Sequence, residues 1–258
     1  MIRDLPGNMA AGNPMEAARR GARPALINRF YKQASVGERE GAFAILLDER
    51  PMLTPAKRPL ALPSRALAGA VAEEWAAQGK QLDPATMPLT RLAHAAIDGV
   101  SADAAAAAAE ILKYAGNDLV IYRAAEPESL VAVQAKHWDP VIDWAGEVLG
   151  ARFRLAEGVK HVTQRDLAIK AVRAEIARYK SPFQLAALMS LTQISGSALL
   201  ALALARGRLS ADEAWAAAHV DEDWNVKRWG EDAEAMARRA ARRLEFDAAA
   251  RMLALLQN

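Results

Sequence analysis

Four prolines at four-residue intervals set the strongest limit on what the first quarter of this chain can form. They are Pro51, Pro55, Pro59 and Pro63. A proline inside a helix removes a backbone hydrogen bond and clashes with the preceding turn, so a helix across this segment is excluded. Extended edge segments and turns tolerate proline. The helical part of the chain must therefore begin after Pro63.

The segment before these prolines favours β-structure. Two β-compatible runs, residues 29–36 and 42–47, flank a glycine-bounded turn at 37–41. Such a pair of runs is typical of a β-hairpin. We therefore expect a small β-rich domain over residues 28–63.

Residues 1–27 show no comparable pattern. The first 24 are rich in Gly, Pro, Ala and Arg and lack an apolar central region, which excludes a secretory signal. Asp4 and Glu16 argue against a mitochondrial presequence, because transit peptides are poor in acids. We expect a disordered tail that is dispensable for folding, with the presequence kept as an alternative.

After Pro63 the pattern is helical almost to the end of the chain. Ser64 can cap a helix that runs to about Gln78, and the pairs Ser181/Gln184 and Ser210/Glu213 fit capping boxes. The expected helices cover 64–78, 89–100, 101–115, 126–149, 163–179, 181–206, 210–227 and 231–256, with short β-like runs at 118–123 and 152–159. Pro140 should kink or divide the fourth of them. The predicted fold class is α+β, mainly α, with a helical domain over residues 64–258.

Composition narrows the function. The chain has 33 basic and 31 acidic residues among 258, and this small net charge argues against nucleic-acid binding. Its longest apolar run, 190–205, is shorter than the roughly 20 residues that a membrane span needs, so no membrane insertion is expected. Cysteine is absent, which excludes disulfides and agrees with a reducing compartment. We expect a cytoplasmic monomer, with the mitochondrial matrix as the alternative location.

No motif for catalysis or metal binding emerges. The chain contains neither of the glycine-rich loops that cradle phosphates, and its four histidines form no pair at metal-ligand spacing. Ser195 and Ser197 flank Gly196 within a helical pattern, so we interpret them as packing residues and not as nucleophiles. We expect no cofactor, no metal and no enzyme activity. An enzyme whose site is assembled from scattered residues remains an alternative.

The strongest candidate for a binding site is residues 221–232, an acidic stretch with two tryptophans. Tryptophan is enriched at binding hot spots, and acidic neighbours can select a basic partner. Core tryptophans beneath an acidic surface are an equally good interpretation of the pattern. The nearby Arg238, Arg239, Arg242 and Arg243 should form a salt-linked solvent face with adjacent acids. The predicted partner-binding residues are Asp221, Glu222, Asp223, Trp224, Trp229 and Glu231.

Two blocks of sequence resemble the assembly chaperones that act on the alpha subunit of ATP synthase. The first comprises residues 118–124, 126–128, 134 and 138–140, and the second residues 191–197, 207, 214–215 and 229–230. Residues 29–32 and 53–57 are also similar, so the resemblance covers about residues 28–235. The family often has a histidine soon after its Trp-Gly pair, whereas residues 231–235 here contain none. This departure weakens what the resemblance implies for positions beyond Gly230.

The resemblance implies a fold and a partner. Family members have a small β-rich domain before a helical domain and are not enzymes. By resemblance, the chain would hold the newly made alpha subunit, cover the surface that later contacts the beta subunit, and leave as the ring assembles. A helical adaptor that merely shares ancestry with the chaperones is the remaining alternative.

Overall fold

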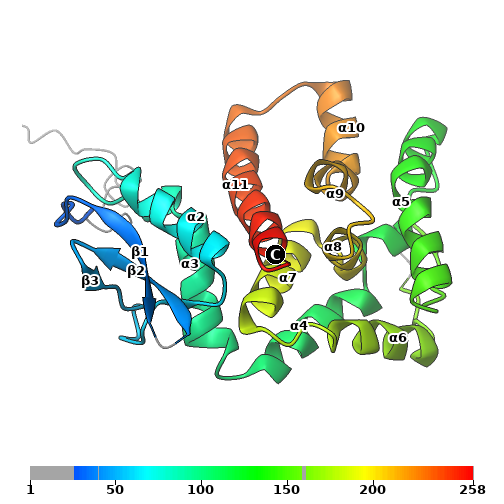
Figure 1. Ribbon diagram of the computed structural model, residues 1–258. Helices are drawn as coiled ribbons and strands as arrows, with labels where there is room; N and C mark the ends of the chain where they lie inside the picture. The colour runs from blue at the N-terminus through cyan, green and yellow to red at the C-terminus, as the bar shows by residue number, and fades with distance from the viewer. Residues whose placement is uncertain (1–25, 40, 159–160, 258) are drawn as a thin grey trace, which may run out of the picture.

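The computed structural model describes residues 26–39, 41–158 and 161–257. A small N-terminal sheet is followed by a larger helical region, which confirms the predicted α+β, mainly α class (Figure 1). Residues 1–25 of the expected tail lie outside the described residues. Residues 26–27 are described, and the Ile27 carbonyl accepts a hydrogen bond from the Leu82 N–H at 2.8 Å.

The N-terminal sheet is built around the predicted hairpin. Its strands are β1 (Ala34–Arg39), β2 (Ala42–Leu47), β3 (Arg50–Pro51) and β4 (Ala61–Leu62). β1 and β2 pair antiparallel from Ala34↔Leu47 to Arg39↔Ala42, and β3 and β4 both pair with β2. The first strand lies later than predicted. The Asp48 carboxylate accepts hydrogen bonds from the Lys32 and Gln33 N–H groups, which turns residues 32–33 into a loop instead of a strand.

The proline segment forms short strands and turns, as its spacing predicts. Pro51 ends β3 and Pro59 makes an isolated bridge with Leu53. Helix α2 (Arg65–Ala76) then begins as expected, because the Ser64 hydroxyl accepts from the Leu67 N–H at 3.1 Å. α2 packs on β1 and β2. The domain boundary between residues 63 and 64 stays a prediction.

The rest of the chain is mainly helical. Its elements are η1 (Pro84–Thr86), α3 (Pro88–Ala95), the π-helical turn η2 (Ala96–Val100), α4 (Ala104–Gly116), η3 (Leu119–Ile121), β5 (Tyr122–Arg123), α5 (Glu128–Val148), β6 (Ala156–Glu157), α6 (Asp166–Ile176), α7 (Pro182–Ser195), α8 (Ala198–Ala205), α9 (Ala211–Ala218), α10 (Val220–Trp229) and α11 (Ala233–Leu255). Both predicted capping boxes are present. Pro140 does not divide α5, which stays continuous through it.

Several predicted boundaries were wrong. The expected helix 181–206 is two helices, because Gly196 adopts a left-handed conformation at φ 70° and the Ser197 hydroxyl caps α8 at the Leu200 N–H. The expected helix 210–227 is divided at His219 into α9 and α10. Asp103, and not Ser101, caps α4. The run 118–123 is a 3-10 turn followed by only two strand residues, because the Asp118 carboxylate caps that turn.

Helices α7 and α8 lie at the centre of the hydrophobic core. Leu188, Leu191 and Leu199 are fully buried, and α11 packs against α7. Phe246, in the C-terminal half of α11, is also buried. The predicted buried helix in this region is therefore confirmed, in two pieces. In the part of the chain that the structure describes, no helix is long and apolar enough to cross a membrane.

Candidate partner-binding site

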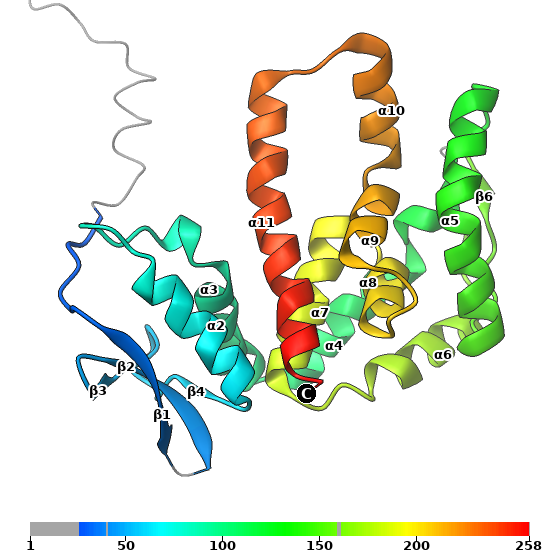
Figure 2. The same ribbon diagram turned by 45° about the horizontal axis from the view of Figure 1, so that its top comes forward.

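A helical hairpin extends beyond this core. We call α10, the connection 230–232 and residues 233–244 of α11 the arm. Figure 2 shows both of its helices rising above the helical body, joined at their far ends. Most arm residues are exposed. The arm therefore offers surface that the described residues of the chain do not cover.

Local sequence explains the far end of the arm. Gly230 ends α10 at φ 90°, a conformation that side chains other than glycine rarely adopt. Two residues later the Asp232 carboxylate accepts a hydrogen bond from the Ala235 N–H at 2.6 Å, which starts α11. The segment after the second tryptophan is thus a turn between two helices.

The two tryptophans of α10 lie in different environments. Their rings meet edge to face with centroids 5.6 Å apart, and the Arg228 guanidinium lies 5.1 Å from the centre of the Trp224 ring. The Trp224 Nε1–H donates to the Ser129 hydroxyl of α5 at 3.4 Å. Trp229 is 71% exposed. The interpretation as a core tryptophan is therefore wrong for Trp229, whose ring is open to a partner.

Two of the predicted acids have partners within the fold. The Asp221 carboxylate accepts from the Gln134 Nε2–H at 2.7 Å, and Gln134 is a buried residue of α5. The Gln134 side-chain oxygen, Oε1, accepts a hydrogen bond from the Ala124 N–H at 2.8 Å. The Asp223 carboxylate pairs with the Arg239 guanidinium of α11 at 2.5 Å. These acids tie α10 to the helices on either side.

Glu222 and Glu231 differ from these two acids. Both side chains are exposed, and no ion pair joins either of them to a described residue. The six predicted residues therefore lie together on the arm but fall into two groups. Asp221, Asp223 and Trp224 have contacts that position α10, whereas Glu222, Trp229 and Glu231 present their side chains to solvent.

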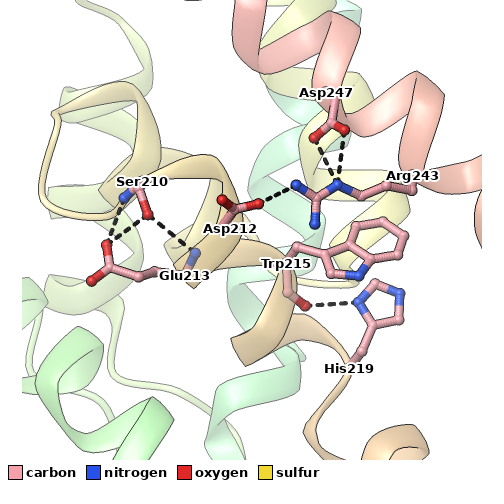
Figure 3. A network of polar contacts seen from close by, with 7 residues as sticks. All are labelled: Ser210, Asp212, Glu213, Trp215, His219, Arg243 and Asp247. Atoms are coloured by element: carbon pink, nitrogen blue, oxygen red, sulfur yellow. Dashed lines mark hydrogen bonds and ion pairs between the residues drawn. The ribbon is translucent and has the colours of Figure 1, made fainter.

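A polar network holds the base of the arm (Figure 3). The Arg243 guanidinium donates to Asp247 at 2.8 and 2.9 Å and also pairs with Asp212 of α9. The His219 ring stacks on Trp215 at 3.8 Å, and burial lowers the pKa of His219, which keeps the imidazole neutral at pH 7. These contacts fix the junction of α9, α10 and α11.

The arginines of α11 form the expected salt-linked face. Arg238 pairs with Glu234 at 2.8 Å, while Arg239 and Arg243 pair with the acids described above. Arg242 donates instead to the Ile194 carbonyl at 2.6 Å. The predicted ionic face therefore holds for Arg238, Arg239 and Arg243 but not for Arg242, and the Arg239 side chain is only 15% exposed.

The sequence places Asp118 and Trp138 in the first family-like block, but it does not show what they contact. Asp118 is fully buried, and its carboxylate accepts from the Leu199 N–H at 3.0 Å, which ties η3 to the start of α8. Burial raises the pKa of Asp118 to about 6. The buried Trp138 donates from Nε1 to the Ala217 carbonyl at 2.7 Å. These family-like residues therefore hold the helices together, through partners 81 and 79 positions away along the chain that a linear sequence does not display.

The geometry defines a class of protein before any relative is considered. A helical body carries an arm with an exposed tryptophan among acids, and tryptophan is enriched at protein-binding hot spots. Within the described ranges no group of three or more His, Cys, Asp or Glu residues could hold a metal ion. The class defined by this geometry is a mainly helical protein with a small N-terminal sheet and an exposed helical arm.

Comparison with known proteins places the chain in a family. Residues 28–146 match the family described as ATP12 chaperone protein. The crystal structure of Atp12 from Paracoccus denitrificans is similar over 89% of this chain and 98% of that chain, at 44% identity and a TM-score of 0.83. The Agrobacterium tumefaciens protein Atu1473, described as a candidate chaperone, is 48% identical with a TM-score of 0.87, over 95% of this chain and 91% of that one. The chain belongs to the ATP12 chaperone family, a family of ATP synthase assembly chaperones.

Proposed function

We propose that this chaperone binds the unassembled alpha subunit of the F-type ATP synthase catalytic head and keeps it from aggregating before it pairs with the beta subunit. The family supplies the assembly role, and the resemblance of the two sequence blocks points to the alpha subunit. An obligate oligomer subunit exposes apolar interface before its partner arrives, and such surface aggregates. A stoichiometric binder meets that need without ATP. We further propose that it acts as a monomer in the bacterial cytoplasm, since the similar proteins named above are bacterial.

The arm is the proposed contact, and the exposure of Trp229 is the observation that carries it. A tryptophan ring that is 71% exposed is a large apolar surface to leave in water. Glu222 and Glu231 flank it as exposed acids that would favour a basic patch on the alpha subunit. Trp224, Asp221 and Asp223 then hold α10 in place for binding.

The test uses purified alpha subunit diluted from denaturant, with aggregation followed by light scattering. The wild-type chain should suppress aggregation at about equal molar ratio. Trp229→Ala should weaken capture by about 30-fold, the effect of losing a hot-spot residue worth about 2 kcal/mol. Leu167→Ala is the matched control, because Leu167 lies on α6 and is 75% exposed.

The outcomes separate the parts of the proposal. A wild-type chain that leaves the alpha subunit to aggregate would overturn the proposed partner. Full suppression by a folded Trp229→Ala variant would exclude the tryptophan as a contact. A pull-down from native lysate without enrichment of the alpha subunit would favour the adaptor alternative.

A further inference from the structure

Helix α10 of the arm has little hydrophobic support of its own. Val220, at its first position, is the one residue of α10 that is buried. Helix α11 differs, because the half beyond the arm contains the buried Phe246, Met252 and Leu253 and continues without a break into the arm. Burial of apolar surface is the main favourable term in packing one helix on another. The core therefore sets the direction of α11, whereas the orientation of α10 depends mainly on polar contacts.

Two of these contacts come from α5, the helix against which α10 packs. The Gln134 Nε2–H donates to the Asp221 carboxylate at 2.7 Å, and the Trp224 Nε1–H donates to the Ser129 hydroxyl at 3.4 Å. The first bond is the stronger, because it is shorter and has a charged acceptor. Ser129 is also exposed, so water competes for the second. The bond between Gln134 and Asp221 is therefore the main polar link from α10 to α5.

The opposite side of α10 is tied to α11. The Asp223 carboxylate pairs with the Arg239 guanidinium at 2.5 Å, and residues two apart point to nearly opposite sides of an α-helix. α10 thus lies between two supports and carries Trp229 on its last turn. Without the bond from Gln134, the link to α5 is weak and the ion pair draws α10 towards α11. The direction of the Trp229 ring then changes with the helix.

Gln134 is chemically matched to its place. Its Oε1 accepts a hydrogen bond from the Ala124 N–H at 2.8 Å, and the residue is only 2% exposed. Because a backbone N–H can only donate, this bond fixes the amide with its nitrogen towards Asp221. A glutamate would have no donor for Asp221, and an apolar residue would have neither donor nor acceptor. The amide therefore holds Asp221 from a position that is itself fixed.

We propose that Gln134 is a positioning residue for client capture, which holds α10, through Asp221, at the angle at which Trp229 meets the client. The inference rests on the proposed function, because the client is the unassembled alpha subunit. It gives Asp221 an inward role as the partner of Gln134. Contact with the client is left to the exposed Trp229, Glu222 and Glu231.

Three variants separate positioning from direct contact. Gln134→Glu keeps the acceptor for the Ala124 N–H but faces Asp221 with a second carboxylate, so the link to α10 is lost. Asp221→Asn removes the charge and keeps an oxygen that accepts from Gln134. The double variant reverses the hydrogen bond, because the new amide at position 221 donates to the new carboxylate at position 134.

Capture of purified alpha subunit is measured as the concentration of chaperone that halves aggregation, at a temperature where every variant is folded. We expect Gln134→Glu to weaken capture by about 10-fold, the result when about a tenth of the molecules hold α10 in the binding orientation. The double variant should recover capture to within about 3-fold of the wild type, because the link is restored. Asp221→Asn alone should weaken capture by no more than about 3-fold, since its hydrogen bond is kept without the charge.

A second measurement reports the orientation of α10 without the client. The chain has no cysteine, so Lys227→Cys on α10 and Leu167→Cys on α6 carry a pair of nitroxide labels at two exposed positions. Double electron–electron resonance then gives the distribution of distances between the labels. We expect one narrow distance in the wild-type background, a broader or shifted one with Gln134→Glu, and the narrow one again in the double variant. A residue that only stabilises the fold would lower the melting temperature without changing this distance.

Other outcomes would contradict the proposal. A label distance or a capture that Gln134→Glu leaves unchanged would overturn the positioning role. Equal loss of capture in Asp221→Asn and in the double variant would also overturn it, because Asp221 would then meet the client through its charge. A wild-type chain that leaves the alpha subunit to aggregate would overturn the proposed function, and the label distances would still decide whether Gln134 orients α10.

Gln134→Met guards against a fold-breaking effect of the buried carboxylate. Methionine is flexible and apolar and offers no donor to Asp221. If Gln134→Glu does not fold, Gln134→Met takes its place in both measurements, with the same expected loss of about 10-fold and no recovery when it is combined with Asp221→Asn. Full capture by a folded Gln134→Met variant would overturn the proposal.

Discussion

Charge reversal at Asp221 and Asp223 should destabilise the fold as well as weaken binding. Replacing Asp221 with lysine removes the hydrogen-bond acceptor of the buried Gln134 amide and should lower the free energy of unfolding by about 1 kcal/mol. This value is at the low end for such a loss, because Asp221 is exposed and water can reach the amide from that side. Replacing Asp223 with lysine breaks the ion pair with Arg239 and places two positive charges side by side. The loss in the free energy of unfolding should be about 1 kcal/mol, because solvent screens the Asp223 side chain, which is 50% exposed.

Helix geometry adds to this cost. Both acids lie in the first turn of α10, where a negative charge typically contributes about 0.3–1 kcal/mol. The double variant Asp221→Lys, Asp223→Lys should therefore lose about 3 kcal/mol in total. For a domain of this size each kcal/mol lowers the melting temperature by about 2–4 °C, so a fall of about 6–12 °C is expected.

The matched control is Glu222→Lys with Glu231→Lys. This pair carries the same charge change, but no ion pair joins either side chain to a described residue. Its cost should be about 1 kcal/mol or less, mainly from Glu222 in the first turn of α10. Thermal unfolding of both variants at pH 7 and their suppression of alpha-subunit aggregation make the comparison. Equal melting temperatures for the two double variants would refute the structural role given to Asp221 and Asp223.

Three further predictions concern the buried Asp118, the left-handed glycine at 196 and ATP binding. The pKa of the Asp118 carboxyl is about 6 in the folded protein, against 3.8 for a free aspartate side chain, so the native state binds the carboxyl proton more tightly than the unfolded state does. The contribution of Asp118 to the free energy of unfolding is therefore greatest below about pH 4 and falls as the pH rises through 6. The stability of the wild type relative to Asp118→Asn should therefore increase by up to about 3 kcal/mol between pH 7 and pH 4 in urea titrations, and a pH-independent difference would contradict it. In the same assay, Gly196→Ala should lower the free energy of unfolding by about 1–2 kcal/mol, because the backbone there has φ 70°. Steric crowding adds little, since an added Cβ would lie 3.9 Å from its nearest neighbour, Leu119. Gly196→Asn should lose less, because asparagine tolerates this conformation better. Calorimetry should detect no micromolar ATP site, because the sequence lacks both phosphate-cradling loops, and a specific heat of binding would end this claim.

Local chemistry made much of the fold predictable. The four prolines excluded a helix before residue 64, and the hydroxyls of Ser64, Ser181 and Ser210 start helices where their sequences predict. These signals involve residues within a few positions of one another, so a linear sequence displays them. The division of the helix predicted over 181–206 was missed because a glycine inside an apolar run is tolerated by a helix as well as by a turn.

The sequence predicted where the candidate site lies along the chain. It did not predict which of its side chains bond within the fold and which face solvent. Acids and tryptophans at 221–231 indicated a binding surface, but the pattern does not distinguish Asp221 from Glu222. Asp221 meets Gln134, 87 positions earlier in the chain, and Asp223 meets Arg239 on the next helix.

Backbone hydrogen bonding and capping act over a few residues, so the mainly helical class, the β-hairpin and the helix starts could be predicted from local sequence. Which polar side chains are satisfied within the fold, and which remain open to a partner, emerged from the folded structure alone. That difference depends on burial and on contacts between distant segments. It is the reason that Asp221 and Asp223 support the arm while Trp229 faces outward.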